Sequence, residues 1–318
     1  MTMTNEMILK QFQEVTKAGN DVTLRDDNAR AFILDAVGNA DTLAKLYHHF
    51  ATSGTGTIDK LGVKSRRTKT HKGINTTPDG TDIADEDSVA FTLLQLYLDA
   101  WIKNDNVFYT ARTRGQDVRQ AITSLMQKQF AVDIQDLGFN GDTTSLDEFL
   151  KQKDGFIKKA KANAASTHSY TKLPRIQTLT KITGELESKY VNSTFKWFMS
   201  RATNLNYVAE VQNRQTNLGD ATIQNGVITM IAGYEVEIVD NMENDVILFA
   251  PYENLAVVFG FEVKYVTAGS DSTAVAKQAT YHFLLQSADF VIREDKAIAY
   301  IDANGEEVED EVEVIPGG

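Results

Sequence analysis

The pattern of apolar and polar residues changes sharply within the first ninety positions. Asp26 or Asp27 can cap a helix whose apolar residues recur at helical spacing to about His49, with Gly38 and Asn39 as a potential break. Residues 1–26 are polar with a few apolar anchors, and they predict an arm or a short helix. From residue 51 to residue 88 the pattern collapses into turn sequences such as TSGTGT and GINTTPDG. We expect a long, protruding hairpin there, because compact domains rarely hold so long a polar connection without a function.

The clearest single element is a long helix at about 118–137. Its apolar positions step by three and four residues, and they are Val118, Ile122, Leu125, Met126, Phe130, Ile134 and Leu137. No proline interrupts this run, and Gly138 with Asn140 and Gly141 is expected to end it. A helix of about 25 residues would be roughly 37 Å long, which suits a structural beam. The preceding segment, 89–102, is rich in aromatic and aliphatic residues and predicts a strand.

The rest of the chain mixes short elements of both kinds. Residues 139–150 and 153–172 are typical of loops, and Pro174 is expected to open a helix. Residues 196–200 predict a short buried strand, and Thr203 or Asn204 is expected to cap a helix to about Arg214. From residue 223 the chain becomes β-rich, and the strongly acidic segment 306–313 predicts an exposed strand or a tail. This order predicts an α+β fold.

Composition excludes several classes of protein. The apolar fraction of 42% and the charged fraction of 24% are ordinary for a soluble globular chain. There is no run of eighteen apolar residues and no signal-peptide pattern, so we expect intracellular synthesis and no membrane partner. The absence of cysteine excludes disulfides, thiolate metal sites and a cysteine nucleophile. A net charge of −12 argues against a general nucleic-acid binder and suits a container whose nucleic acid must not stick to it.

The chain carries no recognisable catalytic motif: GxxxxGK[ST], GxGxxG after a strand, GxSxG and HExxH are all missing. His48 and His49 are adjacent on the predicted helix and lack the spacing of a chelating pair. His282 lies in an apolar strand, where a structural role is expected. Asp133 and Asp136 share a helix face and are interpreted as solvated surface or inter-subunit salt bridges. The sequence therefore predicts no enzyme, no catalytic residue, no cofactor and no metal site.

Two strips of opposite charge lie within the predicted hairpin. The basic strip, residues 60–72, contains no acid, and its charged residues are Lys60, Lys64, Arg66, Arg67, Lys69 and Lys72. The acidic strip follows the turn sequence, and its charged residues are Asp79, Asp82, Asp85, Glu86 and Asp87. A two-stranded arm of this kind cannot bury a core of its own. It would make sense lying on a neighbouring molecule, which points toward assembly.

The basic strip has three interpretations. It could be a solvated run of charge, a nucleic-acid contact, or a contact with an acidic surface on another copy. Residues 60–72 lack the interleaved aromatic residues that stacking on single strands needs, and we favour contact with another copy. The receiving surface stays open between the acidic strip of another copy, Asp133 with Asp136, and the segment 306–313. The inter-subunit candidates are Lys64, Arg66, Arg67, Lys69 and Lys72 with the acidic strip.

The order of elements resembles the major capsid protein of tailed bacteriophages, of the Hong Kong 97 type. The passages that carry this resemblance are FTLLQLYLDAWIKNDNVF, FAVDIQDLGFNGDTTS, KYVNSTFKWFMSRATNLNYV and AGYEVEIVDNMENDVILFAPYENLAVVFG. Two places depart from the family pattern. Residues 234–236 lack the usual proline, and residues 251–253 stand where Gly-Asp is frequent.

The resemblance implies a domain plan. Residues 1–50 would form an N-terminal arm and helix, and 51–90 an extended loop that lies over a neighbouring subunit. A peripheral domain with the strand and the spine helix would span 91–150, and an axial α/β domain 151–270. Residues 271–318 would return as strands to the peripheral domain and continue into the acidic tail.

The resemblance also implies a function and partners. Copies of the chain, as hexamers and pentamers, would form an icosahedral shell that encloses a double-stranded DNA genome without sequence-specific contact. Only residues 1–50 precede the loop, which implies a separate scaffolding protein, and a portal is expected as well. The location would be the virion capsid, assembled in the host bacterial cytoplasm. The alternatives are an encapsulin-like protein compartment and another virion component such as a tail-tube subunit.

Overall fold

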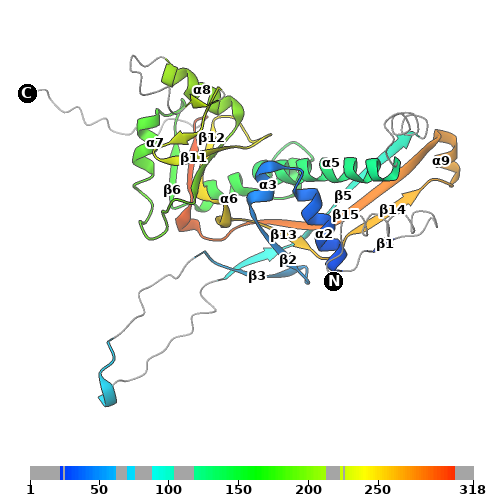
Figure 1. Ribbon diagram of the computed structural model, residues 1–318, viewed down its shortest axis with the longest axis horizontal. Helices are drawn as coiled ribbons and strands as arrows, with labels where there is room; N and C mark the ends of the chain where they lie inside the picture. Colours follow the sequence, from blue (N-terminus) through cyan, green and yellow to red (C-terminus); the bar gives the residue numbers. More distant parts are fainter. Residues whose placement is uncertain are drawn as a thin grey trace, which may run out of the picture. The chain divides into compact units, whose positions relative to one another are not determined.

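A computed structural model describes residues 22–23, 26–61, 70–75, 88–103, 118–212, 223–224 and 226–304. The chain divides into two compact units, each with helices and a sheet (Figure 1). Unit 1 contains the residues up to Gly155 together with Leu255–Arg293. Unit 2 contains Phe156–Asn254 together with the residues from Glu294 onward. Helices and strands alternate irregularly along the chain, which confirms the predicted α+β class.

Unit 1 is built on a sheet in which one long strand, β15 (Ala279–Ile292), pairs with three others. The path of this sheet is β1 (Val22–Thr23), β14 (Lys264–Ala268), β15, β13 (Leu255–Gly260) and β2 (Tyr47–Ala51). Strand β5 (Leu94–Lys103) pairs with β15 outside this path, and α9 (Ser272–Lys277) connects β14 to β15. β13 and β2 are parallel, and the other pairs are antiparallel. The β-rich region expected after residue 223 is confirmed in part by β13, β14 and β15.

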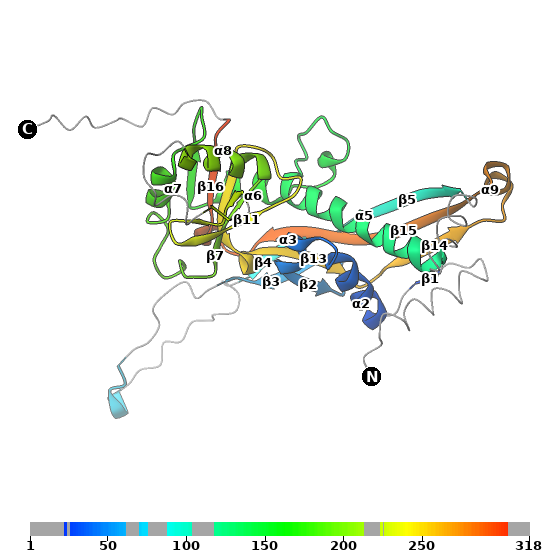
Figure 2. The same ribbon diagram turned by 45° about the horizontal axis from the view of Figure 1, so that its top comes forward.

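One face of this sheet is covered by the helices α2 (Asp26–Val37), α3 (Asp41–Lys45) and α5 (Val118–Asn140) (Figure 2). Gln135 of α5 accepts a hydrogen bond at its Oε1 from the Leu43 backbone N–H of α3, over 3.2 Å. Gln127 Nε2 of α5 donates to the Phe32 carbonyl of α2. α5 reaches the sheet at Phe290, because a Cβ on Gly138 would come within 2.9 Å of that ring. Glycine at this position therefore lets the helix approach the strand closely.

The long helix predicted at 118–137 is confirmed as α5, which has 23 residues. Met126, Phe130 and Ile134 are buried on the side toward the sheet, as the apolar spacing indicated. Leu125 was placed on the same side and is instead 63% exposed. The helix ends at Asn140, within the predicted stop of Gly138, Asn140 and Gly141, and Gly138 itself packs against Phe290.

The helix predicted from 26 or 27 to about 49 is interrupted at Gly38 and Asn39, the potential break, and the prediction is wrong for its last residues. α2 ends at Val37, where Asn39 Nδ2 donates to the carbonyl of Asp35, and α3 is only five residues long. Residues 47–51 form β2, because their aromatic run pairs with β13 in the sheet. His48 and His49 therefore point to opposite faces of a strand. His48 Nε2 donates to the Leu43 carbonyl over 2.9 Å, and burial lowers the pKa of His48.

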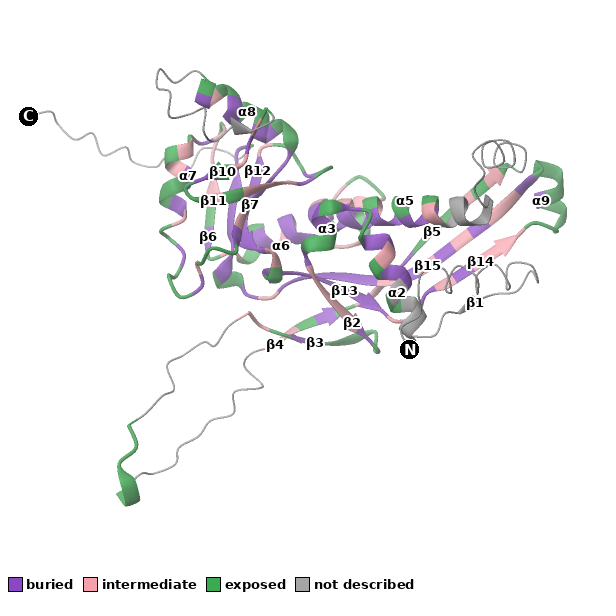
Figure 3. Ribbon diagram, in the orientation of Figure 1, coloured by how far each residue is buried: buried purple, intermediate pink, exposed green. Residues whose placement is uncertain are grey.

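A hairpin is present in the predicted segment, as far as the structure describes it. β3 (Thr55–Asp59) pairs antiparallel with β4 (Ser88–Thr92), with Thr55 opposite Thr92 and Asp59 opposite Ser88. The strand predicted at 89–102 is thus two strands, β4 and β5, separated at Leu93. Within the connection between β3 and β4, the turn Gly73–Asn75 is described and is exposed (Figure 3).

Unit 2 has a mixed sheet covered by short helices. Its strand order is β10 (Met230–Ile231), β11 (Tyr234–Ile238), β7 (Phe195–Met199), β12 (Val246–Pro251), β16 (Ala299–Asp302) and β6 (Ser166–Ser169). Its helices are α6 (Phe156–Asn163), α7 (Ile176–Ile182) and α8 (Arg201–Gln212), and β8 (Ile223–Gln224) pairs with β9 (Val227–Ile228). Trp197 and Phe249 form the centre of its core, with ring centroids 4.3 Å apart and no exposure of either side chain.

Several short elements of unit 2 differ from the prediction. Residues 156–163 and 166–169 form α6 and β6, although both segments were predicted as loops. The helix after Pro174 ends at Ile182. The predicted strand at 196–200 is confirmed as β7, but the helix that follows starts at Arg201. Ser200 caps this helix, since its Oγ accepts a hydrogen bond from the Thr203 N–H over 3.2 Å. Thr203 and Asn204, the predicted caps, lie within the helix and their side chains are buried.

The boundaries of the two units differ from the predicted domains in two places. Strands β13 and β14 fall within the predicted axial segment 151–270, but they pair with β15 in the sheet of unit 1. Residues from Glu294 onward were predicted to return with the strands to the peripheral domain, but β16 lies in the sheet of unit 2. Pairing between strands that are distant in sequence causes both differences, and apolar periodicity carries no information about strand partners.

Candidate assembly site at the root of the hairpin

Successive side chains of β15 point to opposite sides of the sheet, so its two sides contact different elements. Phe290 faces α5, so by alternation the even-numbered residues lie on that side of the sheet and the odd-numbered residues on the opposite side. Asp289 and Val291 of β15, with Arg293 directly after it, are consecutive members of this odd-numbered set. Each of them contacts the β3–β4 hairpin. We call this contact region the hairpin root.

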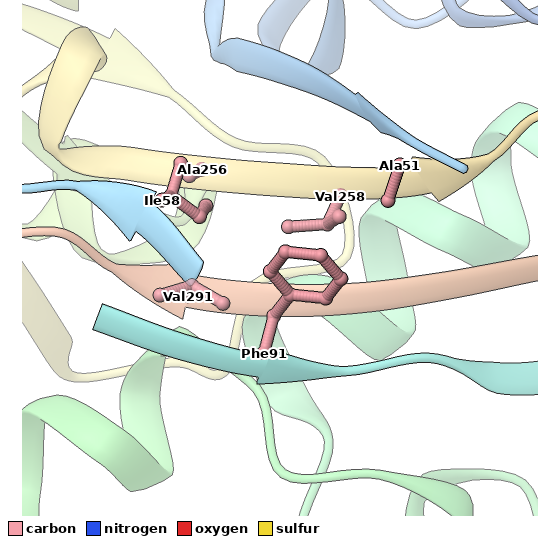
Figure 4. Packing of buried hydrophobic residues seen from close by; sticks show 6 residues of the cluster. All are labelled: Ala51, Ile58, Phe91, Ala256, Val258 and Val291. Atoms are coloured by element: carbon pink, nitrogen blue, oxygen red, sulfur yellow. The ribbon is translucent and has the colours of Figure 1, made fainter. Parts of the chain in front are cut away.

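An apolar cluster forms the centre of the hairpin root (Figure 4). Its buried members are Ala51, Ile58, Phe91, Ala256, Val258 and Val291, and Tyr47, Val89 and Leu93 pack against it. Phe91 is 5% exposed and lies opposite Gly56 in the hairpin register. A Cβ on residue 56 would come within 2.7 Å of the Phe91 ring, so glycine there lets the ring lie across β3. Burial of Phe91 and Ile58 therefore fastens the hairpin to the sheet.

A polar contact holds the β4 side of the root. Asp289 Oδ2 accepts a hydrogen bond from the Thr92 N–H over 2.7 Å, and Asp289 Oδ1 lies 3.1 Å from Lys153 Nζ. Lys153 Nζ also donates to the Thr92 carbonyl over 2.8 Å. The Asp289 side chain is 4% exposed and that of Lys153 is 21% exposed. The charges are paired, as buried charges must be, and they fix the last residue of β4.

A second polar contact holds the β3 side, where the chain leaves the root. Arg293 Nε donates to the Asp59 carbonyl over 2.8 Å, and Nη2 donates to the Lys60 carbonyl over 3.4 Å. The guanidinium lies 4.4 Å from the ring centroid of Tyr47, in cation–π geometry. These contacts fix the position and direction of the backbone at Lys60, the first residue of the basic strip.

Most of the predicted inter-subunit residues lie outside the described part of the chain. Lys64, Arg66, Arg67 and Lys69 belong to 62–69, and the acidic strip, Asp79, Asp82, Asp85, Glu86 and Asp87, belongs to 76–87. Lys72 is described and is exposed, beside Ile74, whose side chain is fully exposed at 101%. The assignment of these residues to contacts with another copy stays a prediction.

The α5 carboxylates Asp133 and Asp136 have hydrogen-bond partners within the same helix. Gln129 Nε2 donates to Asp133 Oδ1 over 2.8 Å, and Asn140 Nδ2 donates to Asp136 Oδ1 over 2.6 Å. Partial burial raises the pKa of Asp133, and the Gln129 hydrogen bond and nearby Asp136 modify it further. Both carboxylates are thus less available to a basic partner than exposed acids are.

Sequence reasoning missed Lys153, Asp289 and Arg293. A signal was present, because Asp289 and Arg293 are charged residues four positions apart in a strand that is otherwise largely apolar. At that spacing they share one face of a strand, where a charged pair needs partners. Nothing in the sequence indicated that those partners would be backbone groups of a hairpin more than 190 residues earlier.

One cluster in unit 2 contains the residue types of a hydrolase triad. Ser166 Oγ lies 2.9 Å from His168 Nε2 and donates to Glu185 Oε2 over 2.6 Å. Glu185 Oε2 also lies 2.8 Å from the same His168 nitrogen. In a triad the serine and the acid contact opposite nitrogens of the imidazole, so that the acid orients the ring while the other nitrogen takes the proton. This cluster lacks that arrangement and ties β6 to the residues after α7.

Within the described ranges, no group of three or more His, Cys, Asp or Glu side chains is arranged to hold a metal ion. None of the helices in the described part of the chain is both long and apolar enough to cross a membrane.

Comparisons with known proteins agree on one class. No model of a protein family matches the chain. The chain is 25% identical over 263 residues to YqbE of Bacillus subtilis (strain 168), whose name describes a prophage capsid protein; the match covers 78% of this chain and 81% of YqbE. A similar solved structure is the satellite phage P4 procapsid, which includes the size determination (Sid) protein. One of its chains has a TM-score of 0.69 at 15% identity, covering 95% of this chain and 98% of that one. A capsid chain of the empty GTA particle has a TM-score of 0.56 at 13% identity, covering 83% and 89%.

The fold is therefore that of phage capsid proteins, of the Hong Kong 97 type, as the order of elements indicated. The chain is thus similar in sequence to a prophage capsid protein and shares its fold with capsid chains of solved phage particles. The comparisons do not favour the encapsulin-like compartment or the tail-tube subunit.

Proposed function

We propose that the chain is the major capsid protein of a tailed phage, and that its hairpin lies over a neighbouring copy in the shell. One observation carries this proposal. The hairpin is fastened at its root by a buried apolar cluster and two polar contacts, whereas the described turn Gly73–Asn75 is exposed. A fixed base with an exposed end is what an element needs when its partner lies on another molecule.

The exposed end supports this reasoning. Ile74 is 101% exposed, and a large aliphatic side chain gains free energy when it is buried. In the isolated chain Ile74 is exposed, so this free energy is not gained. A neighbouring copy in a capsomer would supply the surface. The fixed direction of the chain at Asp59 and Lys60 reduces the entropy that the arm would lose on docking.

The charges of the arm would then determine how copies fit together. Single exposed ion pairs stabilise by only about 0–1 kcal/mol, but a shell repeats each contact in every copy. Such pairs affect register and association rate more than affinity. In this proposal the basic strip contacts an acidic surface of the next copy, through Lys64, Arg66, Arg67, Lys69 and Lys72. The acidic strip, residues 79–87, contacts basic groups there.

The same proposal assigns the remaining partners. Hexamers and pentamers of the chain enclose double-stranded DNA without sequence-specific contact, consistent with the net charge of −12. A separate scaffolding protein and a portal act during assembly, which occurs in the cytoplasm of the host bacterium. The chain acts as a structural protein without catalytic activity, consistent with the Ser166, His168 and Glu185 geometry.

Electron microscopy of the purified chain tests the shell. Closed, hollow particles are expected, whereas tubes or a small discrete oligomer would contradict the proposal. Particles purified from infected or induced cells should absorb strongly in the nucleic-acid band. Particles with only protein absorbance and a protein cargo would instead support the encapsulin-like compartment.

The role of the arm is tested by reversing its charge. The double variant Arg66→Glu with Arg67→Glu should keep the monomer folded, by circular dichroism, and abolish particle formation. The matched control is Lys172→Glu with Lys181→Glu, which reverses two exposed charges of unit 2 and should assemble normally. Normal particles from the Arg66 and Arg67 variant would refute the assigned role of the basic strip.

A further inference from the structure

The odd-numbered side of β15 continues beyond the hairpin root and carries aromatic residues there. The register places Tyr281 opposite Trp101, Phe283 opposite Asp99, and Leu285 opposite Tyr97. Because partners in register point to the same side of a sheet, these residues share one face. On the opposite side, His282 and Leu284 are buried, at 6% and 1% exposure. We call the set Tyr97, Trp101, Tyr281 and Phe283 the aromatic face.

The rings of the aromatic face contact one another in a continuous series. Ring centroids are 5.0 Å apart for Trp101 and Tyr281, 6.5 Å for Tyr281 and Phe283, and 5.6 Å for Phe283 and Tyr97. The series ends in exposed side chains, with Tyr97 at 66% and Trp101 at 38% exposure. A contiguous apolar surface of this kind on a sheet marks a site of contact with another molecule.

Basic residues surround this face. Lys277 Nζ lies 4.1 Å from the ring centroid of Trp101, a cation–π contact. Lys103 follows Trp101 by two residues in β5, and Lys264 of β14 lies opposite Leu285, so both are on this side of the sheet. Among the described residues of β5 and β15 on this face, the acidic residue is Asp99, which accepts a hydrogen bond from the Tyr281 hydroxyl over 3.3 Å. An aromatic surface with a basic rim is unusual on a chain whose net charge is −12.

The sequence contains one segment with the complementary composition. Residues 306–315 read EEVEDEVEVI, with six acids, no base and three valines. In an extended conformation, alternate residues share a side. One side would then carry Glu306, Val308, Asp310, Val312 and Val314, and the other would carry four glutamates and Ile315. The first side offers valines to the rings and carboxylates to the lysines, while the second remains in water.

We propose that residues 306–315 of one copy bind, in extended conformation, to the aromatic face of another copy. The ten residues would extend roughly 33 Å at 3.3 Å per residue, which is the length of a ten-residue strand such as β5. This inference rests on the proposed function, because shell assembly brings the second copy within reach. It gives the acidic segment, which the shared fold does not account for, a binding surface of its own.

Charge distinguishes this occupant from the hairpin of a neighbouring copy. The acidic strip of the hairpin is accompanied by the six cations of the basic strip, which the lysine rim would repel. Residues 306–315 contain no cation, so the whole segment is attracted. The acidic strip also has a single large aliphatic residue, Ile83, against three valines and an isoleucine in 306–315.

The absence of cysteine allows a direct test by disulfide trapping. Gln95→Cys places a thiol on the same side of β5 as Tyr97, at an exposed position outside the ring series. Two single-cysteine chains, Gln95→Cys and Val312→Cys, are mixed before assembly and oxidised mildly after it. Only a contact between copies can then link the two positions. Mass spectrometry should find the peptide that joins residue 95 to residue 312.

The matched control uses Gln129→Cys, at an exposed glutamine on α5 in the same unit. Linkage of residue 312 to residue 95 should exceed linkage to residue 129 at least tenfold. Equal yields, or no linkage to residue 95 in intact shells, would refute the binding surface while leaving the shell itself established. Failure of all chains, including the parent, to form particles would instead contradict the proposed function. A double variant that carries both cysteines and is kept unassembled tests for a contact within one chain. If residues 95 and 312 link within that chain, and no link forms between copies, binding between copies is also refuted.

A second measurement tests the chemistry of recognition. Lys264→Glu with Lys277→Glu, introduced into the Gln95→Cys chain, should lower the yield of the link to residue 312 at least fivefold. The double reversal at Lys172 and Lys181 should leave that yield unchanged. Equal yields from both reversals would show that the basic rim does not attract the segment.

Discussion

Lys153 and Asp289 form an ion pair that joins the loop after α5 to the strand that carries the hairpin root. The Lys153 ammonium lies 3.1 Å from Asp289 Oδ1, and the same ammonium donates to the Thr92 carbonyl. Asp289 accepts the Thr92 N–H with its other oxygen. The end of β4 is therefore held through both of its backbone groups by two oppositely charged side chains.

Asp289→Ala should destabilise the hairpin root by about 3 kcal/mol, because it leaves a partly buried ammonium unpaired and the Thr92 N–H without its acceptor. Hydrogen exchange measured by mass spectrometry on peptides covering 88–103 reports this change locally. The control is Glu187→Ala, which removes exposed ion pairs with Lys189 and Lys296 in unit 2 and should leave exchange of both units unchanged. Unchanged exchange of 88–103 in Asp289→Ala would show that the pair is dispensable.

Phe91→Ala should detach the hairpin while leaving the sheet of unit 1 intact. Removing a buried phenylalanine costs about 3–5 kcal/mol, and the apolar cluster of the root has few other large members. Exchange of 88–92 should then rise strongly, exchange of β15 should change little, and particles should not form. Phe91→Leu retains most of the buried volume and should assemble. Efficient assembly by Phe91→Ala would contradict a fixed root as the requirement for assembly.

Asn254→Ala should be among the most destabilising polar substitutions in unit 2. Asn254 is fully buried, accepts the Glu294 N–H over 2.7 Å, and donates to the carbonyls of Glu294 and Ala297 over 3.0 and 3.1 Å. Removing the amide leaves three buried backbone groups without partners, for a cost of about 3 kcal/mol or more. Thermal unfolding measures it. Asn192→Ala removes only exposed hydrogen bonds to Thr194 and should shift the transition far less.

Acidification should destabilise unit 1 through His282. Burial lowers the pKa of His282 to about 4 from its ordinary value of 6.5, and the Tyr265 hydroxyl lies 2.6 Å from its Nδ1. Because the folded chain favours the neutral ring, the stabilisation is complete above pH 6.5. It is lost progressively as the pH falls from 6.5 to about 4, by up to about 3 kcal/mol.

Urea unfolding of the parent and of His282→Gln at pH 7 and pH 4.5 isolates this contribution. Glutamine cannot titrate and can still accept from the Tyr265 hydroxyl, so the difference between the two proteins should shrink at the lower pH. A difference that is constant with pH would show that His282 does not carry the effect.

Periodicity predicted elements that are long or uniformly patterned, and failed where packing between distant segments decides the structure. α5 was predicted from the spacing of its apolar residues, and β7 from a short apolar run that is buried on both sides. Residues 47–49 were predicted as the end of a helix, since their spacing suits a helix and only pairing with β13 makes them part of a strand. α6 and β6 were missed because they are short and polar.

The candidate site was predictable in outline and not in its anchoring. Turn sequences and the two charged strips located the hairpin, since they are local features of the chain. The contacts of Asp289, Arg293 and Lys153 with backbone groups of the hairpin depend on the tertiary fold. The aromatic face was hidden for the same reason, because Tyr97 and Phe283 are brought together only by pairing of β5 with β15.

The alternation of β15 has a consequence for how its sequence can change over time. A deletion or insertion of one residue within residues 279–292 would move every side chain beyond it to the opposite side of the sheet. Asp289 would then be directed at α5, and Phe290 would be directed at the hairpin. Substitutions can accumulate in this strand one at a time, but changes of length are confined to the loops on either side. Alignments of related chains should therefore run without gaps across all fourteen positions of β15, even where few residues are identical.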